Sequence, residues 1–544
     1  MPIAKFRSPF VSAICGLALS ALMIGSLPAV AIANGDNPGQ ETGRIRAAVS
    51  AATTIYADAV NGSDSTGDGT QGNPYKSLSM AAGNAYDGDT IQLLPGTYSP
   101  STTNESFYIG MAAVTLRGSG SDSTILDGEN DWTQDNINSY TRMLNYSNDS
   151  GTTASIEDMT IRGAGEAAVD IYRGNLTINN CVFAKNYHDD SGAAILMRYG
   201  NGTEKISITN CVFTENNCDE SGGAICLYNP GDTEISQNTF LENEAGQGAA
   251  IFSEGSGGSA VDIHCNKIQD STTQYNGAVY LDNTSDSTAV KFYNNLVTGN
   301  ISAGNSTSAL FLSNDVSTSV YNNTFSANAG GNTLYDWGEV KNALVYNNIF
   351  WGDAPVDTEL VAGDYYYNDI QNMSAAGFDT NMHVDPLFVD AANGDYHLQA
   401  GSPCRGAGVS DSTYPAPDTD LDGVGRPTGT GHVSMGAYEF VTIQFDPLPG
   451  LSAPINLDEG QVVWQNPFII KVFPTSNAGI QRVEFYVDDV LIGTVTEPDA
   501  SGVYSCAWDT AKYHSLVRVV AYDNQGGKVT LTRNTTVALP YTGR

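Results

Sequence analysis

The chain has 544 residues, among them 57 glycines and 28 tyrosines, and only 15% of its residues are charged. It is therefore long and apolar enough for two or three folded domains and is not an intrinsically disordered protein. Sixty acidic against 24 basic residues give a net charge of −36 at pH 7, which repels phosphates and excludes a nucleic acid partner. The acidity favours a neutral or cationic partner, divalent cations, or solubility outside the cell.

Residues 1–33 have the features of a secretory signal peptide: a basic start, an apolar run, and the small residues Ala31 and Ala33 at the spacing that signal peptidase prefers. A retained membrane anchor is the alternative, but the small residues suit cleavage better than spanning. We expect cleavage after Ala33, a linker over residues 34–54, and a mature protein that is exported and inserts no segment into a membrane.

The next segment begins with a strand at Ile55, followed by a loop rich in Gly and Asp. A short helix is expected from about Lys76 to Ala85, and the phrase "TIQLLPGTYS" then resumes the alternation of a strand.

The main feature that follows is an internal repeat. The phrase "NCVFAKNYHDDSGAAI" begins at Asn180 and returns as "NCVFTENNCDESGGAI" at Asn210. An apolar anchor recurs every 25 to 30 residues, at Phe183, Phe213, Phe240, Ile268, Val297, Phe325 and Phe350. The segments between the anchors alternate apolar and polar residues as strands do, and none shows a convincing helical period.

Asparagine occupies two fixed positions in most repeats. The position two residues before the anchor holds Cys181, Cys211, Asn238, Asn266, Asn295, Asn323 and Asn348, and the position three residues after it holds Asn186, Asn216, Asn243, Ser271, Asn300, Asn328 and Asp353. Stacked asparagine amides hydrogen-bond from one coil to the next, and asparagine tolerates the left-handed backbone of a tight turn. The sequence therefore predicts stacked coils with strands about 4.8 Å apart.

These repeats resemble the right-handed parallel β-helix of the pectate-lyase-like superfamily over residues 55–371. The resemblance implies an all-β fold, a right-handed parallel β-helix solenoid with an N-terminal helix cap, followed by a β-sandwich. The short helix would cover the open apolar end of the solenoid. Because this fold hosts lyases, hydrolases, epimerases, esterases and adhesins, it does not name the activity.

Two neighbouring repeats carry acidic pairs that later repeats lack: Asp189 with Asp190, then Asp219 with Glu220. Matching positions would place these carboxylates side by side on adjacent coils, where they repel one another unless a cation or a shared proton intervenes. Calcium, which takes oxygen ligands, suits Asp189 and Asp219. The alternative is that all four are solvated loop residues.

Residues near these acidic pairs could support either of two reactions, lyase cleavage or hydrolysis. The resemblance to polysaccharide lyases implies that Arg198 or His188 draws a proton from a uronic acid beside the calcium ion. In a hydrolase, Asp190 and Glu220 would act as acid and base, which needs two carboxyls about 5 to 9.5 Å apart. No lyase motif surrounds Arg198, so no catalytic role is carried over from that family.

The strand after each of these loops predicts a binding surface. If its apolar column points inward, alternation sends Phe252, Tyr280 and Phe311 outward, with Tyr228 and Asp282 two residues further along. Outward aromatic rings stack on sugars, and the polar residues complete a groove typical of carbohydrate sites. The alternative is that a loop folds over this face and the rings are ordinary packing.

After the coils, residues 372–440 contain "DPLFVDAANGDYHLQAGSPCRGAG" and resemble the closing module called the choice-of-anchor Q domain, which implies attachment to the cell surface. Within this module, "DTDLDG" places Asp418, Asp420 and Asp422 at alternate positions before a glycine, as in the first half of an EF-hand calcium loop. The distal glutamate of such a loop is missing, and a plain Asp-rich turn is the alternative.

A Pro-rich linker over residues 441–455 leads to residues 456–544, whose period-two strands resemble a bacterial Ig-like β-sandwich. The final "LPYTGR" fits the pattern cut by sortases but lacks the apolar span of a sortase substrate, so we treat it as coincidence or as the trace of a shortened tail.

These features together predict a secreted or cell-surface protein that binds extracellular polysaccharide and, in one reading, cleaves it as a uronic-acid lyase or a glycoside hydrolase, with calcium as the candidate cofactor. The rival hypothesis is a non-enzymatic adhesin or structural stalk, because "GGAI" and "FTEN" also resemble adhesin repeats. No CxxC, GxSxG, HExxH or P-loop motif supports zinc, serine hydrolase or nucleotide chemistry.

Overall fold

The computed structural model describes residues 52–130, 142–147, 151–255, 260–283, 289–313, 317–337, 343–352, 365–371, 380–399, 401–426, 432–439, 461–463, 468–472, 480–488, 490–498, 504–508, 514–523 and 528–537. The predicted signal peptide, the predicted linker 441–455 and the terminal "LPYTGR" lie outside these residues. Within them, no helix is long and apolar enough to cross a membrane.

The described coils contribute strands to four parallel sheets. Sheet I consists of β1 (Thr54–Ala57), β2 (Thr90–Leu93), β5 (Thr115–Arg117), β8 (Thr153–Glu157), β11 (Asn175–Asn179), β15 (Lys205–Thr209), β19 (Asp232–Ser236), β23 (Val261–His264), β27 (Ala289–Tyr293), β31 (Ser317–Tyr321), β34 (Leu344–Tyr346) and β36 (Tyr365–Tyr366). Sheet II consists of β4 (Ile109–Met111), β7 (Leu144–Ser147), β10 (Val169–Arg173), β14 (Ile195–Met197), β18 (Ile225–Tyr228), β22 (Ile251–Gly255), β26 (Val279–Asn283), β30 (Thr307–Ser313) and β33 (Asn332–Trp337).

Sheet III consists of β3 (Gly96–Tyr98), β6 (Thr124–Asp127), β9 (Thr160–Arg162), β12 (Val182–Ala184), β16 (Val212–Thr214), β20 (Thr239–Leu241), β24 (Lys267–Gln269), β28 (Leu296–Thr298), β32 (Thr324–Ser326), β35 (Ile349–Trp351) and β37 (Asp369–Ile370). Sheet IV is short and consists of β13 (Tyr187–His188), β17 (Asn217–Cys218), β21 (Glu244–Ala245), β25 (Thr272–Thr273) and β29 (Ile301–Ser302).

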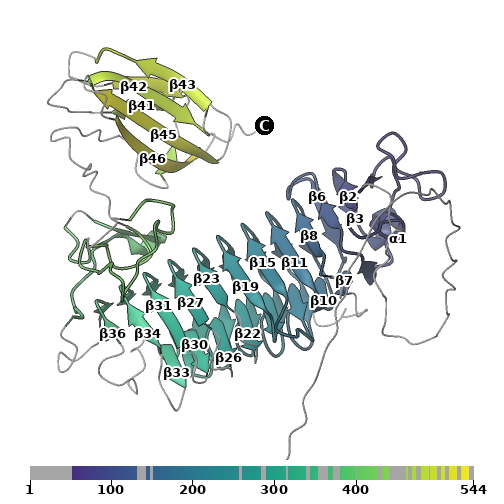
Figure 1. The fold of residues 1–544 in the computed structure, drawn as a ribbon, viewed down its shortest axis with the longest axis horizontal. Coiled ribbons are helices and arrows are strands. Elements are labelled where there is room, and N and C mark those ends of the chain that lie inside the picture. The colour runs from purple at the N-terminus through teal and green to yellow at the C-terminus, as the bar shows by residue number, and fades with distance from the viewer. Residues whose placement is uncertain are drawn as a thin grey trace, which may run out of the picture. The chain divides into compact units, whose positions relative to one another are not determined.

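In a middle coil the chain passes through sheets I, III, IV and II in that order and then enters sheet I of the next coil, as β11 to β15 do. The sheet I strands of successive coils, such as β11, β15, β19 and β23, lie side by side (Figure 1). Equivalent strands of successive coils pair in parallel. The predicted β-helix is confirmed.

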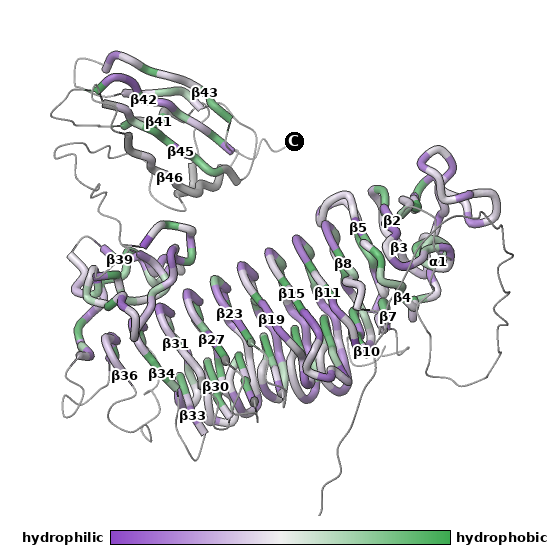
Figure 2. The backbone as a smooth tube through the Cα atoms, in the orientation of Figure 1, coloured by the Kyte–Doolittle hydropathy of each residue, from purple (hydrophilic) through white to green (hydrophobic). Residues whose placement is uncertain are grey.

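One apolar core fills the solenoid. The predicted anchors Phe183, Phe213 and Phe240 are fully buried, and their rings stack with centroids 5.0 and 4.9 Å apart. Hydrophobic and hydrophilic residues alternate along the strands (Figure 2), so each strand places one set of side chains in this core and the other outside it.

The predicted asparagine stacks are confirmed. In the first stack, each Nδ2 donates to the Oδ1 of the next coil at 2.9 to 3.1 Å, from Asn238 through Asn266, Asn295, Asn323, Asn348 and Asn368 to Asn381. The second stack joins Asn186 to Asn216 and Asn216 to Asn243 at 2.9 and 3.0 Å. Because these side chains are buried, every donor and acceptor of each amide needs a partner, and the next coil supplies it.

The left-handed backbone lies one residue before the first stack. Asn294, Asn322 and Asn347 have φ of 52°, 54° and 58°, and Asn180 and Asn210 take the same conformation. The prediction attached this conformation to the stacked asparagines, but it is the residue before each that turns the chain from sheet I to sheet III.

The helix at the N-terminal end is α1 (Leu78–Gly83), inside the predicted range. Its N-cap Ser77 accepts from the amide of Met80, and the carboxylate of Glu105 accepts from the amides of Leu78 and Ser79 at 2.6 and 3.0 Å. The helix turns Leu78 and two alanines toward the core, as a cap requires. A single turn, α2 (Pro100–Thr103), follows.

Beyond the coils, β38 (Phe388–Asp390), the 3-10 turn η1 (Ala391–Asn393) and β39 (Asp395–Leu398) form a hairpin. The C-terminal domain is a β-sandwich with its own core, as predicted. Its two sheets are β40 (Gln461–Val463), β46 (Lys528–Val537), β45 (His514–Asp523), β42 (Ile480–Val487) and β43 (Val490–Val495), and β41 (Phe468–Val472) with β44 (Tyr504–Trp508).

Asn295→Ala should destabilise the β-helix strongly. Asn295 bonds to Asn266, Asn323 and the carbonyl of Ile263, and each buried group left without a partner costs about 1–3 kcal/mol. Denaturant unfolding followed by circular dichroism measures the loss. Asn217→Ala, which removes a half-buried amide bonded to Glu244, is the control, and equal midpoints for the two variants would contradict the role of the stack.

Candidate functional site

Sheet II presents two rows of side chains on its outer face. Its inward residues, such as Ile225 and Leu227, belong to the solenoid core, whereas Cys226 and Phe252 belong to a separate cluster. Strand register aligns the first outward position of each coil into row A: Asp170, Leu196, Cys226, Phe252, Tyr280, Phe311 and Tyr335. Two residues further along lies row B, in which register aligns Tyr228, Glu254, Asp282, Ser313 and Trp337. We include Tyr172 and Arg198 in row B because each comes two residues after the row A residue of its own coil.

Row A contains the predicted aromatic column, but the rings of that column pack against one another and are largely shielded from solvent. Phe252 and Phe311 are 3% and 6% exposed, and Tyr280 lies between them with its ring centroid 4.8 Å from each. The outward direction predicted from alternation is confirmed. The ring faces, however, contact one another instead of lining an open groove, so these three rings have the geometry of ordinary packing.

The loop between sheets IV and II covers row A. Gly192 and Gly222, from the repeated "SGAAI" and "SGGAI", both have φ of 72°, and a Cβ on either would lie 3.0 or 2.6 Å from the Cβ of Cys226. Only glycine accepts both this backbone and this approach. The repeated glycine therefore brings the loop backbone directly against the outer face of the sheet.

Row B is open to solvent at several places. Trp337 and Tyr172, at its two ends, are 61% and 39% exposed, and Glu254 between them is exposed as well. Tyr228 and Asp282 are half-buried. The exposed ring of Tyr199 lies 4.7 Å from that of Tyr172. The outer face thus carries aromatic rings at Tyr172, Tyr228 and Trp337 and hydrogen-bonding groups between them.

Two arginines meet at one end of row B. Nε of Arg198 and Nη1 of Arg142 lie 3.2 and 3.3 Å from Oδ2 of Asp170, and Arg142 also pairs with Glu166. The carboxylate side chains of Asp170 and Glu166 are 4% and 11% exposed, whereas those of the arginines are 23% and 29% exposed. The carboxylates therefore lie beneath the guanidinium groups.

His188 and Asp190 complete this arginine cluster. Nη2 of Arg198 lies 3.3 Å from Nε2 of His188, and the amide of Asp190 donates to Nδ1 at 3.1 Å. Burial, together with the Arg198 charge, lowers the pKa of His188, and two facing donors also oppose its protonation. The carboxylate of Asp190 is half exposed and lies 3.8 Å from Nη1 of Arg198. The structure thus brings together three of the four predicted catalytic residues.

The fourth, Glu220, lies on the next coil. It follows Asp219 just as Asp190 follows Asp189, and its amide donates to the carbonyl of Asp190 at 2.8 Å. The side chains of both acidic pairs, Asp189 with Asp190 and Asp219 with Glu220, are exposed. In the described part of the chain, no three His, Cys, Asp or Glu side chains gather as a metal site would require. The calcium role of Asp189 and Asp219 stays a prediction.

A different pair of carboxylates lies within row B. Glu254 on β22 and Asp282 on β26 are direct neighbours in register. Partial burial and the charge of Asp282 raise the pKa of Glu254. Two carboxyls on adjacent strands, one of them easier to protonate, are the arrangement that acid–base chemistry uses.

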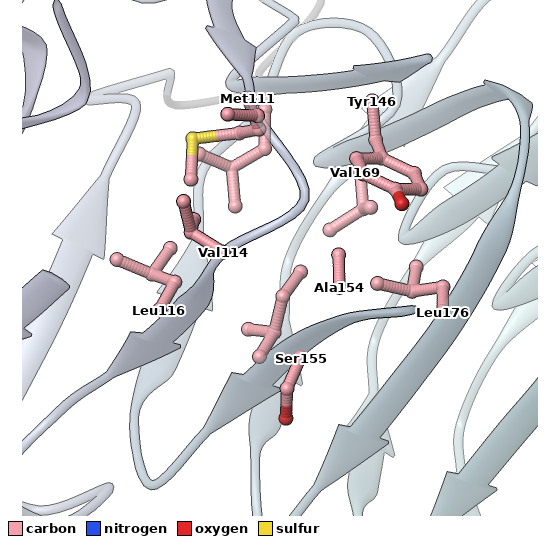
Figure 3. Close-up of a pocket in the computed structure, with 11 residues that line it drawn as sticks. Met111, Val114, Leu116, Tyr146, Ala154, Ser155, Val169 and Leu176 are labelled. Carbon is pink, nitrogen blue, oxygen red and sulfur yellow. The ribbon is translucent and has the colours of Figure 1, made fainter. Parts of the chain in front are cut away.

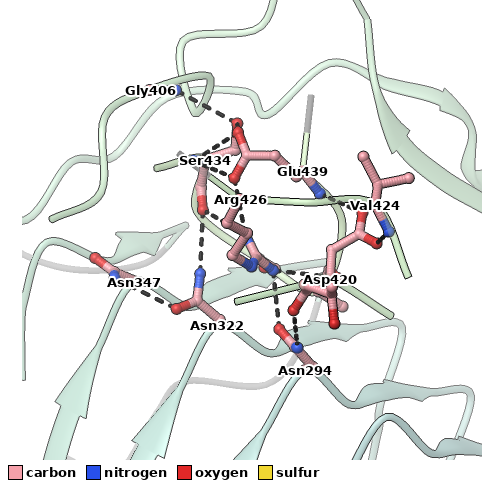
Figure 4. Close-up of polar contacts among 12 residues, drawn as sticks. Asn294, Asn322, Asn347, Gly406, Asp420, Val424, Arg426, Ser434 and Glu439 are labelled. Carbon is pink, nitrogen blue, oxygen red and sulfur yellow. Dashed lines mark hydrogen bonds and ion pairs between the residues drawn. The ribbon is translucent and has the colours of Figure 1, made fainter. Parts of the chain in front are cut away.

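The "DTDLDG" turn uses its carboxylates internally. Oδ1 of Asp420 accepts from the amides of Asp422 and Val424, and its Oδ2 accepts from the amide of Glu439 at 2.7 Å (Figure 4). Burial raises the pKa of Asp420 to about 6. Asp418 is exposed and contributes its carbonyl to the turn. These contacts are those of the Asp-rich turn that was the alternative to calcium binding.

This module binds the side of the coils through a buried arginine. Arg426 pairs with Glu439 at 3.0 Å, and its Nη2 donates to Asn294 at 2.9 Å (Figure 4). Asn322 and Asn347 donate to the carbonyls of Ser434 and Val409. The left-handed turn residues of the last coils are thus the docking points of the closing module.

His397 links two of the module's carboxylates. Nδ1 lies 2.6 Å from Asp395 and Nε2 lies 2.8 Å from Asp422. Burial alone would lower the pKa of His397, but hydrogen bonds to both carboxylates outweigh it and raise the pKa to about 9. The predicted ligand Asp422 is therefore paired with a charged imidazole.

The described pocket lies inside the solenoid (Figure 3). Its lining is almost entirely apolar and consists of Met111, Ala112, Val114, Leu116, Leu144, Tyr146, Ala154, Ser155, Ile156, Val169 and Leu176. Such a lining offers a substrate few hydrogen-bonding groups, so this space is a packing defect of the first coils rather than a site.

Comparison with known families supports the two folds. Residues 144–306 match the family model described as right handed beta helix region, and residues 455–536 match the one described as bacterial Ig domain. The solenoid is accordingly a right-handed parallel β-helix and the C-terminal domain is Ig-like. None of the curated proteins is significantly similar to the chain in sequence.

Several solved structures are distantly similar. XylC in complex with xylose is 12% identical with a TM-score of 0.39, over 71% of this chain and 98% of its own. A mannuronic acid specific polysaccharide family 6 lyase from human gut microbiota is 12% identical with a TM-score of 0.30, over 63% and 93%. The fibronectin(III)-like modules of CbhA from Clostridium thermocellum are 23% identical with a TM-score of 0.14, over 16% and 98%.

Sequence reasoning missed residues that the structure places at this site. Asp170 and Tyr172 lie in "VDIYRGN", which aligns with "ILMRYGN" one coil later, so the repeat itself contained the signal. Arg142 precedes a strand without the repeat phrase, and Trp337 ends the last strand of sheet II. The positions of Arg142 and Trp337 relative to row B depend on the strand register between coils of unequal length, which the sequence does not specify.

His397→Gln should lower stability at neutral but not at high pH. Because the folded-state pKa of about 9 exceeds the ordinary value of 6.5, the stabilisation is complete below about pH 6.5 and disappears as the pH rises through 9. Melting temperatures of the variant and the unmodified protein should differ at pH 6 and converge at pH 10. His432→Gln, at an exposed position of the same module, is the control; a difference that persists at pH 10 would contradict the charged imidazole.

Proposed function

We propose that this is an exported protein that binds an extracellular polysaccharide along row B, on the outer face of sheet II. The observation that carries the proposal is row B itself: aromatic and polar side chains at seven successive coils. At about 4.8 Å per strand, the row spans roughly 29 Å.

The shape of row B favours a linear polymer over a small molecule. Small ligands are held in concave pockets that bury most of their surface, and row B is a strip. Tyr172 and Trp337 offer exposed rings at its ends, while Arg198, Glu254 and Asp282 offer hydrogen bonds between them. Rings with an apolar face and a polar edge suit sugars, which have both kinds of surface.

Hydrolysis of the bound glycan is a second candidate function, favoured by the adjacent Glu254 and Asp282. Protonated Glu254 would give its proton to the glycosidic oxygen, and ionised Asp282 would attack the anomeric carbon. Water would then release the sugar from Asp282, with Glu254 taking the proton of that water. Carboxyls on neighbouring strands match the roughly 5 Å separation of retaining glycosidases.

A lyase has less support from the arginine cluster. Arginine stays protonated in proteins, and Arg198 lies beside Asp170 and Asp190. His188 is the better proton acceptor, but it is only 3% exposed. Calcium between Asp189 and Asp219 remains part of the proposal, as an ion that would hold an acidic sugar, and is tested by adding calcium or a chelator to each assay.

Replacing Tyr172 or Trp337 with Ala should weaken glycan binding. Loss of one stacking ring costs about 0.5–1.5 kcal/mol, or roughly two- to twelvefold in affinity for each variant. A glycan array followed by calorimetry on the bound polymer measures this. Tyr275→Ala, which removes a tyrosine that is 63% exposed but lies outside row B, is the control. If the Tyr172, Trp337 and Tyr275 substitutions all weaken binding equally, row B is not the binding site.

Glu254→Gln and Asp282→Asn should each abolish hydrolysis while leaving binding intact, because only the proton donor and the nucleophile are removed. Reducing ends report hydrolysis, and absorbance near 235 nm reports the unsaturated products of a lyase. Products that persist in both variants exclude this pair as the catalysts. Binding without any product, with or without calcium, identifies a non-enzymatic adhesin.

A further inference from the structure

The arginine cluster lies at one end of row B and the paired carboxylates Glu254 and Asp282 lie further along it. We propose that the cluster binds one anionic sugar, carrying a carboxylate or a sulfate ester, within an otherwise uncharged stretch of polysaccharide. This deepens the proposed function and rests on it.

Arg198 and Arg142 retain donors for such an anion. A guanidinium has five N–H groups, and the described contacts of Arg198 engage three of them, with Asp170, His188 and Asp190. Arg142 uses two, toward Glu166 and Asp170. The remaining N–H groups lie on side chains that are 23% and 29% exposed, where an oxyanion reaches them.

The buried members of the cluster hold the arginines in place. Oδ2 of Asp170 receives both guanidinium groups at 3.2 and 3.3 Å and is itself hidden from solvent. A neutral His188 contacts Arg198 without cancelling its charge. Asp170 and His188 are thus positioning residues, and planar guanidiniums fixed in this way are suited to bidentate recognition of an oxyanion.

Asp190 occupies the place where the anion would bind. Its carboxylate is the exposed one of the cluster, and it lies 3.8 Å from Nη1 of Arg198, too far for a good hydrogen bond. A ligand carboxylate or sulfate would compete with this loose contact. Removing the charge of Asp190 should therefore strengthen binding of an anionic sugar, although it removes a group that could bind sugar hydroxyls.

The remainder of row B disfavours further charges. Glu254 and Asp282 lie two and three strands beyond Arg198 in register, about 10 and 14 Å along the axis. That distance exceeds the Debye length of about 8 Å at physiological salt, so an anion at the arginines is largely screened from them. A polymer charged at every sugar would place carboxylates against both, which fits an isolated anionic sugar better than a polyuronate.

Matched oligosaccharides test this with the full mature chain. Calorimetry should show glucuronoxylan fragments, with isolated uronates, binding at least about tenfold more tightly than uncharged xylan fragments, because hydrogen bonds from a guanidinium to a carboxylate are stronger than those to a neutral sugar hydroxyl. Carrageenan and agarose fragments give the same comparison for sulfate and separate the two sources of charge. Polygalacturonate should bind more weakly than the preferred sparsely charged fragment.

Three variants locate the effect. Arg198→Gln should remove the preference for the charged fragment, because it weakens binding of that fragment about tenfold more than binding of its uncharged counterpart, and Asp170→Asn should reduce the same ratio. Asp190→Asn should raise affinity for the charged fragment about threefold. Glu242→Gln, at an exposed carboxylate outside row B and outside the arginine cluster, is its control and should change nothing.

The possible failures are distinct. Equal affinity for charged and uncharged fragments, or an Arg198→Gln variant that weakens both equally, overturns the anionic subsite and leaves polysaccharide binding intact. If polygalacturonate binds most tightly, the inference that the site prefers a single anionic sugar within an uncharged stretch is wrong. No binding to any fragment by a correctly folded protein overturns the proposed function and, with it, this inference.

Discussion

Parallel pairing of equivalent positions in successive coils is the constraint on which the rest of this structure depends. Whatever side chain stands at one position faces its counterpart about 4.8 Å above and below. Asparagine satisfies this condition because its amide both donates and accepts, so a buried column of it extends through seven levels with every bond near 3 Å. Phenylalanine satisfies it by stacking in the core.

The same constraint decides which outer surface is available for binding. In row A, the aromatic rings stack on each other, and Gly222 and Gly248 bring a loop backbone against Cys226 and Phe252 of the same row. Row B lies beyond that loop and receives no such cover at Tyr172, Glu254 or Trp337. A stacked column of rings therefore supports the sheet, and the neighbouring row, with its mixed charges, is left for a ligand.

The carboxylates of the outer face differ in the charges that lie beside them. Asp170 is buried beneath two arginines that share it, whereas Glu254 and Asp282 are direct neighbours in register, where partial burial and the charge of Asp282 raise the pKa of Glu254. The closing module also pairs its carboxylates with cationic side chains, since Arg426 pairs with Glu439 and His397 with Asp422. Carboxylates that arginine or histidine holds are therefore suited to a structural role, and the neighbouring Glu254 and Asp282 to the catalytic role proposed for them.

The sequence alone determined the repeating coils of the β-helix and the elements at its two ends. The period, the two asparagine columns, the cap helix and the Ig-like strands follow from residues close together in the chain, and the structure has them where they were predicted. The direction of Phe252 and the shared row of Tyr228 and Asp282 followed from strand alternation. Only the tertiary structure decided which outward residues are exposed, that Arg142 and Arg198 meet on Asp170, and that Asp420 is engaged by backbone amides. The reason is physical: alternation fixes a side chain's face within one strand, but burial and charge pairing depend on loops and coils of unequal length, whose register no local pattern specifies.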